Sequence, residues 1–349
     1  MKATLIHGPG DIRLEEVPDP AIQRPTDAIV RVTASCVCGS DLWPYRGVTE
    51  TKKPSRIGHE FVGVVEEVGD EVEALRAGDF VIAPFHASDS TCVHCRNGIN
   101  TSCERGAWWG GRDEHGLRVD AGQGEAVRVP MADGTLVPTP ERPDDAMVPS
   151  LLSLSDVMAT GHHAALAAAV EPGTNVVIVG DGAVGQCAVL AARRLGADHI
   201  VMMSRHEDRQ RLAREFGATD VVAERGGAGV EAVHDLLGGV GADAVLECVG
   251  TRESMEQAID SARPGGRVGY VGVPNGGAEL PIFKLFAANV AVGGGVAPAR
   301  AYIPDLLEDV LAGTLDPGPV FDLELPLVQV AEAYAAMDER RCIKALLRP

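Results

Sequence analysis

A glycine-rich turn at residues 176–185 limits the fold more than any other segment of this 349-residue sequence. The segment reads Val-Val-Ile-Val-Gly-Asp-Gly-Ala-Val-Gly, so Gly180, Gly182 and Gly185 stand at G-x-G-x-x-G spacing. The apolar residues before the turn predict a strand, and the Ala- and Leu-rich residues 183–195 predict a helix. A strand that enters a helix through this spacing predicts a dinucleotide-binding βαβ unit.

Each residue of the turn has a physical task in such a unit. Gly180 permits the tight turn, Gly182 lets a pyrophosphate approach the backbone, and Gly185 lets the helix pack closely on the strand. Ala183 and Val184 open the helix, whose free N–H groups and partial positive charge suit the phosphates. The alternative is a glycine-rich turn that binds no ligand.

The pattern of predicted secondary structure changes near residue 173. Short Val-bearing runs broken by Gly and Pro come before it, at residues 28–33, 61–68 and 80–83 among others, and predict a mainly antiparallel β region. After it, predicted strands at 175–179, 199–203, 220–223, 243–249 and 267–273 alternate with helices at 183–195 and 207–216, which predicts a parallel sheet covered on both faces. Helical patterns return at 301–311 and 327–337. We therefore expect an α/β protein in which a doubly wound nucleotide-binding domain, residues 156–295, interrupts a second domain formed by residues 1–155 and 296–349.

Composition excludes several classes of function. Lys and Arg number 31 against 50 Asp and Glu, a formal net charge of −19, whereas nucleic acids and anionic membranes attract basic surfaces. No apolar run is long enough to span a bilayer, and residues 1–6 lack the pattern of a signal peptide. We therefore expect a cytoplasmic protein, in which the eight cysteines do not form a disulfide framework.

The end of the second predicted strand of the nucleotide-binding domain indicates the cofactor. An enzyme that uses NAD places Asp or Glu here to bind the ribose 2′-hydroxyl. This sequence has Ser204 and Arg205 instead, and a guanidinium can pair with the 2′-phosphate of NADP while a serine adds a hydroxyl donor. The alternative is a solvated loop arginine.

Two groups of residues have the composition of zinc sites. Cys38 and His59 supply a thiolate and an imidazole, which with one more anionic ligand and an open position make a catalytic site. Cys36 could compete with Cys38, and a buried cysteine beside a packed histidine is the alternative without a metal. The second group is a lobe at about residues 86–110, in which four potential ligands predict a closed structural site: Asp89, Cys92, Cys95 and Cys103. Three free thiols in a loop are the alternative there.

Together these motifs resemble the zinc-dependent medium-chain alcohol dehydrogenases over essentially the whole chain. The matching residues are Cys38-Gly39-Ser40-Asp41, Gly58-His59-Glu60, Gly78-Asp79-Phe80-Val81, the cysteine lobe and the glycine turn. The resemblance implies a GroES-like, mainly β catalytic domain around a Rossmann domain. In cofactor and zinc-site pattern the sequence is closest to the NADP-dependent secondary-alcohol dehydrogenases. We expect the chain to form a homodimer or a homotetramer.

The resemblance also assigns roles that spacing does not reveal. It implies that Asp156 is the third ligand of the catalytic zinc and that Glu60 is an exchangeable carboxylate beside the metal. Ser40 matches the hydroxyl that takes the alcohol proton, but Trp43 stands where many relatives have the histidine that ends the proton relay. Asp89 stands where the family has the first of four structural cysteines; capping of a turn is its alternative role, and His86 and His94 are poorly placed to replace it.

The implied activity is the interconversion of an alcohol and its aldehyde or ketone by hydride transfer with NADP(H). Trp43, Trp108 and Trp109 could line an apolar substrate pocket or pack the lobe. A polyol or amino-alcohol substrate is the second possibility within the family. A non-catalytic NADPH-binding protein is the alternative from another class, because the fold alone does not prove the chemistry.

Overall fold

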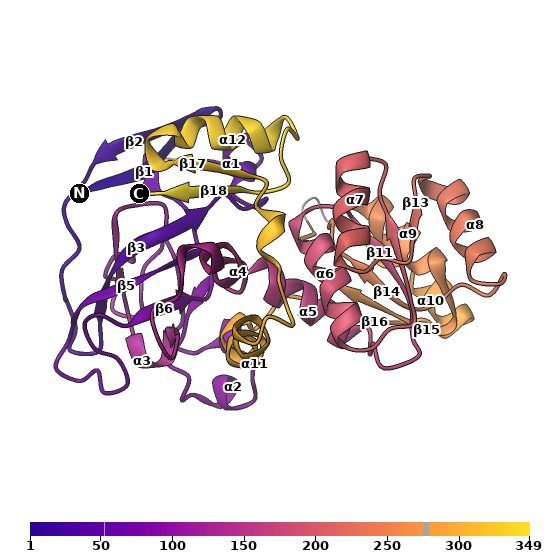
Figure 1. Ribbon diagram of the computed structural model, residues 1–349, viewed down its shortest axis with the longest axis horizontal. Helices are drawn as coiled ribbons and strands as arrows, with labels where there is room; N and C mark the ends of the chain where they lie inside the picture. The colour runs from indigo at the N-terminus through magenta and orange to yellow at the C-terminus, as the bar shows by residue number, and fades with distance from the viewer. Residues whose placement is uncertain (52, 275–278) are drawn as a thin grey trace. The chain divides into compact units, whose positions relative to one another are not determined.

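The computed structural model describes residues 1–51, 53–274 and 279–349. Contacts divide the chain into two compact units. The first unit comprises Met1–Asp156 and Pro298–Pro349, and the second comprises Val157–Ala297. The second unit is thus one continuous stretch of sequence, whereas the first is built from two separate stretches (Figure 1).

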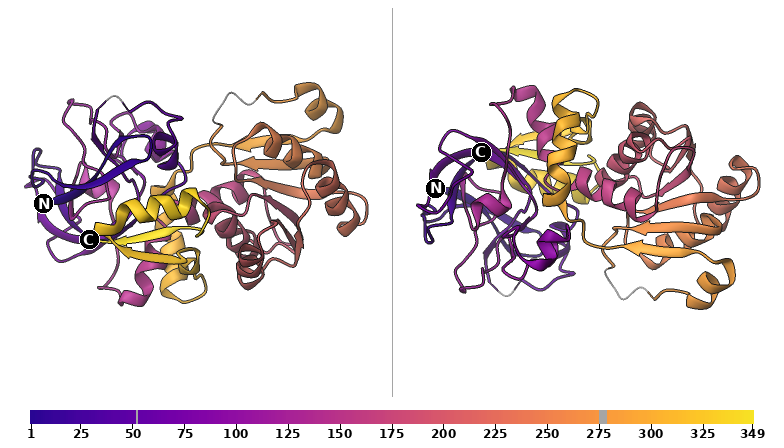
Figure 2. Two further views of the ribbon diagram at one scale, coloured as in Figure 1. Left: turned by 90° about the horizontal axis from the view of Figure 1, so that it is seen from above. Right: turned by 90° about the horizontal axis from the view of Figure 1, so that it is seen from below.

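The second unit is a doubly wound parallel sheet of six strands in the order β13-β12-β11-β14-β15-β16. Its strands are β11 (Asn175–Val179), β12 (His199–Met203), β13 (Asp220–Val222), β14 (Ala242–Glu247), β15 (Ala262–Tyr270) and β16 (Ala291–Gly294). Its helices are α5 (Val157–Ala167), α6 (Ala183–Arg194), α7 (Glu207–Phe216), α8 (Gly226–Leu236), α9 (Arg252–Ser261) and α10 (Ile282–Ala288). Helices cover both faces of this sheet (Figure 2), which buries the apolar strands between them.

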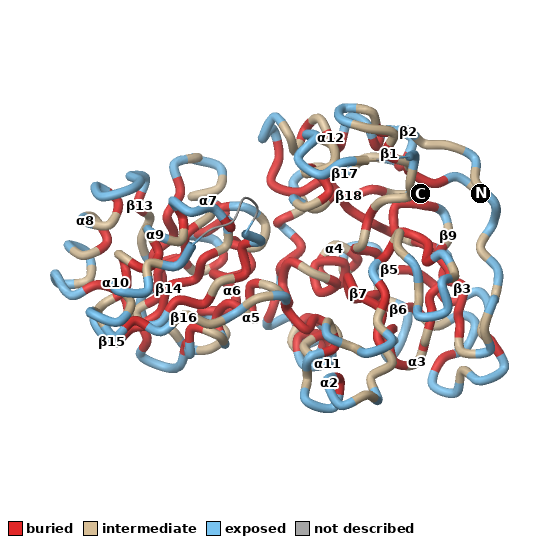
Figure 3. Tube along the Cα trace, turned by 180° about the vertical axis from the view of Figure 1, so that it is seen from behind, coloured by how far each residue is buried: buried red, intermediate tan, exposed pale blue. Residues whose placement is uncertain are grey.

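The first unit has a seven-stranded sheet in the order β10-β6-β5-β3-β18-β17, with β9 also paired to β3. Every pair in it is antiparallel except β17 with β18. Its strands are β3 (Ala28–Cys36), β5 (Phe61–Val68), β6 (Phe80–Ala83), β9 (Ala126–Val129), β10 (Val137–Pro138), β17 (Leu323–Pro326) and β18 (Ala345–Arg348). The buried faces of these strands form the core seen as red segments inside this unit in Figure 3.

Smaller elements complete the first unit. Its other strands are β1 (Lys2–Gly8), β2 (Asp11–Glu16), β4 (Ser55–Arg56), β7 (His86–Ala87) and β8 (Ala107–Trp108). Its helices are α1 (Leu42–Tyr45), α2 (Val93–Arg96), α3 (Ala132–Thr135), α4 (Val148–Ser153), α11 (Ala299–Leu311) and α12 (Val330–Asp338), with 3-10 turns η1 (Asn100–Ser102), η2 (Asp145–Met147), η3 (Gly318–Val320) and η4 (Leu327–Gln329). Helix α12 lies against β17 and β18 (Figure 1), so elements from the C-terminal stretch complete a sheet begun by the N-terminal one.

The fold class expected from the sequence is confirmed: a mainly β unit of GroES-like type and a Rossmann-type parallel sheet. Among the described residues, the strands at 61–68, 80–83, 175–179 and 199–203 and the helix at 207–216 have the predicted bounds. The fifth strand predicted for the parallel sheet, at 267–273, has other bounds in the structure, where β15 begins at Ala262 and ends at Tyr270. No helix within the described ranges is both long and apolar enough to cross a membrane.

Candidate metal and cofactor sites

Four of the residues singled out in the sequence converge in the first unit. Cys38, His59, Glu60 and Asp156 each offer a ligand atom, and these atoms all lie within 4.8 Å of one another. Asp156 Oδ2 lies 3.6 Å from Cys38 Sγ and 3.5 Å from His59 Nε2. Ligands at zinc bond lengths of about 2.0–2.3 Å in a tetrahedron stand about 3.3–3.8 Å apart, so these three atoms have the spacing of a zinc site.

Adjacent ends of two paired strands bring these side chains together. Ser35 pairs with Phe61, so Cys38 follows the end of β3 at the place where His59 and Glu60 lead into β5. Gly58, with φ of +99°, makes the sharp turn before His59, a conformation that other residues rarely adopt. Asp156 follows α4 and immediately precedes α5.

Glu60 is the fourth member of this group and is fully buried. Its Oε1 accepts a hydrogen bond from Lys344 Nζ at 2.7 Å, whereas its Oε2 has no hydrogen-bond partner among the described residues. A buried carboxylate oxygen without a partner is costly. The free oxygen therefore fits a site that is completed by a cation, and this donor set of sulfur, nitrogen and oxygen suits zinc.

The charges around His59 also favour a cation. Burial by itself lowers the pKa of His59, but Asp41 and Cys38 outweigh burial and raise it well above its ordinary value. The protonated, positively charged form of His59 thus partly neutralises a cluster of anionic groups. A divalent ion held by the same groups would replace that positive charge.

Lys344 is a neighbour of this group that the sequence did not reveal. Its side chain is 1% exposed, and its ammonium donates to Glu60 and to the Val37 carbonyl oxygen, at 2.7 and 3.2 Å. The partners are separated by 284 residues, and they meet because β18 pairs with β3. The available signal was a lone lysine in the apolar run Cys342-Ile343-Lys344-Ala345-Leu346, since a charge inside a buried strand needs a partner.

Asp41 is a second residue whose role is visible only in the structure. Its Oδ1 lies 3.4 Å from His59 Nδ1, and its Oδ2 accepts from the Cys38 backbone N–H at 3.0 Å. Asp41 therefore touches both His59 and the residue that carries the thiol. Cys36, the competing thiol, is fully buried and is not a member of the converging group.

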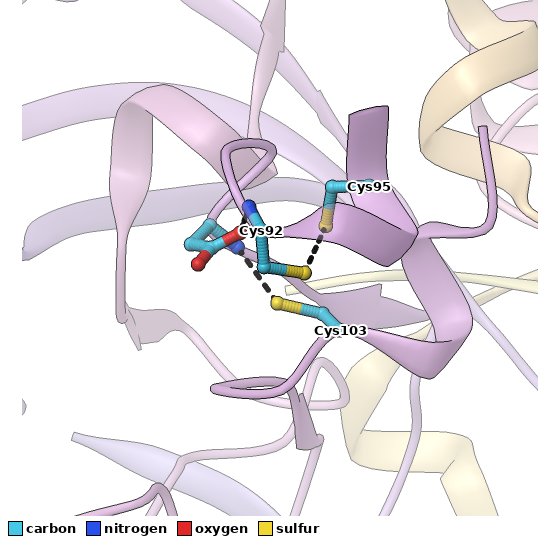
Figure 4. A group of neighbouring side chains, drawn as sticks. Cys92, Cys95 and Cys103 are labelled. Carbon is cyan, nitrogen blue, oxygen red and sulfur yellow. Dashed lines mark hydrogen bonds between the residues drawn. The ribbon is translucent and has the colours of Figure 1, made fainter. Parts of the chain in front are cut away.

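The cysteine lobe forms the second converging group. Asp89, Cys92, Cys95 and Cys103 offer ligand atoms within 4.8 Å of one another. The three thiols point toward a common centre (Figure 4), and the Cys92 and Cys95 sulfurs are 3.5 Å apart. The short helix α2 holds these two cysteines on one turn, and η1 leads the chain back to Cys103.

Asp89 both caps a turn and faces the thiols. Its Oδ1 accepts from the backbone N–H groups of Thr91 and Cys92, at 2.8 and 3.0 Å. Partial burial opposes ionisation, but these donors outweigh it and lower the pKa of Asp89 to about 2. The capping role foreseen as an alternative thus coexists with a position among the ligands, because the cap uses only one of the two oxygens.

The histidines near the lobe do not join this group. Neither His86 nor His94 belongs to a metal-compatible cluster of the described residues. Burial lowers the pKa of His86 to about 4, and its ring meets Trp108 edge-on, with centroids 4.6 Å apart. His86 is therefore a neutral packing residue.

The glycine turn of the second unit has the geometry expected of a phosphate-binding loop. Gly180 has φ of +112°, and a Cβ on Gly185 would stand 1.7 Å from the Gly180 carbonyl oxygen. A Cβ on Gly182 would meet nothing within 4 Å, so the backbone is open to a ligand there. Ala183 and Val184 form the first turn of α6, with Gly182 as its N-cap. Residues and space therefore fit a dinucleotide pyrophosphate.

Ser204 and Arg205 follow β12 in the same unit. They differ in whether the side chain is free to bind a ligand. Ser204 is buried, and its hydroxyl donates to Asp181 Oδ2 at 2.7 Å; Arg209 pairs with the other oxygen of Asp181 at 3.0 Å. The single hydroxyl proton of Ser204 is therefore engaged within the protein. Arg205 is exposed and forms no ion pair with any residue in the described ranges, so its guanidinium is available.

The three tryptophans lie in different environments. Trp109 is a core residue, since it packs edge-on against Phe61 at 5.0 Å and donates to the Pro84 carbonyl oxygen. Trp108 is 52% exposed and stacks on Phe85, with ring centroids 6.1 Å apart. Ser40 is half-buried in the turn after Cys38, and Trp43 is half-buried in helix α1. Trp108 and Trp43, but not Trp109, are thus free to meet a ligand.

Comparisons with known proteins show which family the chain resembles. Residues 24–141 match the alcohol dehydrogenase GroES-like domain, and residues 183–312 match the zinc-binding dehydrogenase family. A zinc-type alcohol dehydrogenase B of Aspergillus flavus is 32% identical, with 100% of this chain and 81% of the relative covered. A probable zinc-binding alcohol dehydrogenase of Mycobacterium tuberculosis is 33% identical over 97% of this chain and 86% of its own.

A solved structure shows the same fold over its full length. The alcohol dehydrogenase TADH from Thermus sp. ATN1 superposes with a TM-score of 0.91 at 32% identity, covering 100% of this chain and 99% of its own. Similarity on this scale in sequence and structure, together with the two matching family models, identifies the family. The chain belongs to the zinc-dependent medium-chain alcohol dehydrogenases.

Proposed function

We propose that this protein interconverts an alcohol and its aldehyde or ketone by hydride transfer with NADP(H), using a catalytic zinc. The observation that carries the proposal is the convergence of Cys38, His59 and Asp156 beside Glu60, whose second oxygen has no partner among the described residues. Family membership establishes an oxidoreductase of the alcohol dehydrogenase type, and the converging ligands support the metal dependence.

Each residue of the site has a role in this proposal. Cys38, His59 and Asp156 would hold the ion, which when bound supplies a Lewis acid that polarises the substrate oxygen. Ser40 receives the proton of the alcohol hydroxyl and passes it toward solvent. Glu60, held by Lys344, places a carboxylate beside the three ligands. Trp43 replaces the histidine of many relatives, so the relay beyond Ser40 must use another group.

A cofactor and substrate screen tests the proposed function. Oxidation of NADPH and NADH is followed with a panel of aldehydes and ketones, and reduction of NADP⁺ and NAD⁺ with the corresponding alcohols, polyols and amino alcohols. Because Trp108 presents an aromatic face, we expect apolar substrates to react fastest. Activity should disappear on removal of zinc and return with zinc. A zinc-loaded protein that turns over no member of the panel would refute the proposal.

Arg205→Ala is the test of cofactor choice. Loss of one charge-assisted pair with the 2′-phosphate costs about 1.5–3 kcal/mol, or about 10- to 100-fold in affinity. We therefore expect the variant to bind NADPH that much more weakly and NADH almost unchanged, as measured by titration of cofactor fluorescence. Arg211→Ala is the matched control, since Arg211 is an exposed arginine of the following helix α7 that pairs with Asp208. A wild-type enzyme that prefers NADH would contradict the assignment.

Asp89→Asn is the test of the structural zinc, which we propose is held by Asp89 and the three cysteines of the lobe. Asparagine keeps the oxygen that caps the turn but removes the negative charge and weakens the ligand. Zinc content should therefore fall from about two per chain to about one, while catalysis at the other site persists. In the wild type this site should empty first under mild chelation, because oxygen holds zinc less tightly than a fourth thiolate.

The matched variant is Asp89→Cys, which supplies that fourth thiolate. It should retain zinc longer than the wild type when both are exposed to the same chelator. If Asp89→Asn retains two zinc ions per chain and the stability of the wild type, Asp89 serves only as a cap.

We also propose that the protein is a homo-oligomer, and we place the contact on the second unit. Helix α10 presents Ile282, Phe283 and Phe286 at 67%, 82% and 79% exposure, and β16 is an edge strand of its sheet among the described residues. Large exposed apolar residues beside a sheet edge are typical of a surface that pairs with a second copy. A monomer in sedimentation at micromolar concentration would contradict this.

A further inference from the structure

A series of polar contacts links Tyr334 on helix α12 to the Nδ1 side of the His59 ring. The Tyr334 hydroxyl donates to Gln123 Oε1 at 3.0 Å, and Gln123 Nε2 donates to Asp41 Oδ2 at 3.2 Å. The other oxygen of Asp41 lies 3.4 Å from His59 Nδ1. Tyr334, Gln123 and Asp41 are all buried, so water does not compete with these contacts.

The neighbouring groups fix the direction of each bond. Gln123 Nε2 has a second acceptor, the Cys36 carbonyl oxygen at 3.0 Å, so both of its hydrogens are used. Both partners of this nitrogen are acceptors, whereas the Tyr334 hydroxyl that faces Oε1 can donate. A flipped amide would place its oxygen against the two acceptors, so Gln123 has one favourable orientation.

Gln123 also holds the backbone that precedes His59. Its backbone N–H donates to the Ile57 carbonyl oxygen at 3.3 Å, and that of Gly122 donates to the Gly58 carbonyl oxygen at 2.8 Å. The Gln123 side chain fills the space beside Gly58, where a Cβ would stand 2.4 Å from Gln123 Cγ. The backbone and the carboxylate on two sides of His59 are therefore set by the same residue.

We propose that Gln123 and Tyr334 are positioning residues of the catalytic zinc centre. They hold Asp41, and Asp41 holds the His59 ring so that Nε2 faces Cys38 and Asp156. The inference rests on the zinc site proposed above. A partner on the second nitrogen of a ligating histidine fixes its tautomer and orientation, and loss of such a partner typically costs about 10- to 100-fold in metal affinity.

Tyr334→Phe tests this role with the loss of one oxygen atom. Protein equilibrated with chelator-buffered zinc should show catalytic-site affinity reduced about tenfold, at the lower end of that range. Gln123→Met removes both amide donors and should lose more, toward about 100-fold. Cys38→Ser, which should lose the catalytic zinc, measures the zinc that is bound by the cysteine lobe alone. With Co²⁺ in place of zinc, the visible bands of the catalytic site should shift in Tyr334→Phe, because they report ligand geometry.

Two comparisons separate positioning from a general loss of packing. Tyr45 packs against Tyr334, with ring centroids 5.4 Å apart, but takes no part in the hydrogen-bond series from Tyr334 to Asp41. Tyr45→Phe should therefore leave zinc affinity and the Co²⁺ bands unchanged. In an Asp41→Asn background, Tyr334→Phe should have little further effect, because the link to His59 is already broken.

The inference is overturned if Tyr334→Phe binds zinc as the wild type does, or if its loss is as large with Asp41→Asn as without it. A wild-type protein without zinc at Cys38 would instead refute the zinc dependence of the proposed function. The two failures are thus distinguishable.

Discussion

Cys38→Ser is expected to abolish turnover while leaving cofactor binding intact. The variant loses the thiolate that faces Asp156 and His59, and a hydroxyl is a poor replacement for a soft, anionic zinc ligand. Lewis-acid assistance is worth several kcal/mol, so kcat should fall by about a thousandfold or more. The glycine turn and Arg205 belong to the other unit, so the dissociation constant for NADPH should not change. Steady-state kinetics, cofactor titration and zinc analysis on one preparation measure all three.

Cys36→Ser is the matched control for this experiment. Cys36 lies two residues away and is also a thiol, but it is not in the converging group. Its variant should keep catalytic zinc and turnover. Activity retained by Cys38→Ser, or zinc lost by Cys36→Ser alone, would show that the ligand has been misassigned.

Lys344→Met is expected to lower the free energy of unfolding of the first unit by about 3–5 kcal/mol, the usual cost of removing one member of a buried ion pair. Methionine fills a similar volume, but Glu60 then keeps its charge without a counter-ion. Burial already holds the pKa of Glu60 above its ordinary value, and loss of Lys344 removes the charge that opposes this shift. Urea unfolding followed by tryptophan fluorescence reports this unit, because Trp43, Trp108 and Trp109 all belong to it.

The pH dependence of Lys344→Met has a defined sign. A carboxyl whose pKa is raised on folding contributes its stability below the pKa of the unfolded chain and loses it as the pH rises through the folded value. The deficit of the variant should therefore be largest at neutral pH and shrink toward pH 4. The double variant Lys344→Met/Glu60→Gln should regain much of the stability, since neither charge remains. A deficit in Lys344→Met that is independent of pH would mean that Glu60 is not its cause.

The parts of the molecule that depend on local sequence could be predicted. The glycine turn, with its preceding strand and following helix, follows from steric rules: Gly180 needs a positive φ, and Gly185 has no room for a side chain. The strands at 61–68 and 199–203 follow from short β-branched runs. The lobe could be located because its four potential ligands lie within a stretch of fifteen residues.

Contacts between distant segments could not be predicted in this way. Lys344 contacts Glu60 across 284 residues of sequence, and Tyr334 contacts Gln123 across 211 residues. The first contact depends on the pairing of β18 with β3. No local pattern sets that register. Asp156 came from family resemblance alone, since spacing does not link it to Cys38.

Local chemistry was also ambiguous where one residue type suits two environments. Trp109 was expected either to line a pocket or to pack the lobe, and only its contact with Phe61 and its bond to Pro84 show that it is core. Ser204 was expected to face the cofactor phosphate, but Asp181 accepts its proton. In both cases the deciding partner lies in another segment of the chain.

Synthesis from the N-terminus delivers the second unit before the first can be finished. At about 5–20 residues per second, roughly 10–40 s separate the emergence of Asp156 from that of Lys344. During this interval β3 lacks its partner β18, and Glu60 lacks its counter-charge, although Cys38, His59 and Asp156 are already present. The second unit is one continuous stretch of sequence, whereas the sheet beside the proposed zinc ligands is still incomplete at this stage. A zinc ion held by Cys38, His59 and Asp156, as proposed, would therefore lack the buried Lys344–Glu60 pair beside it until β18 has been synthesised.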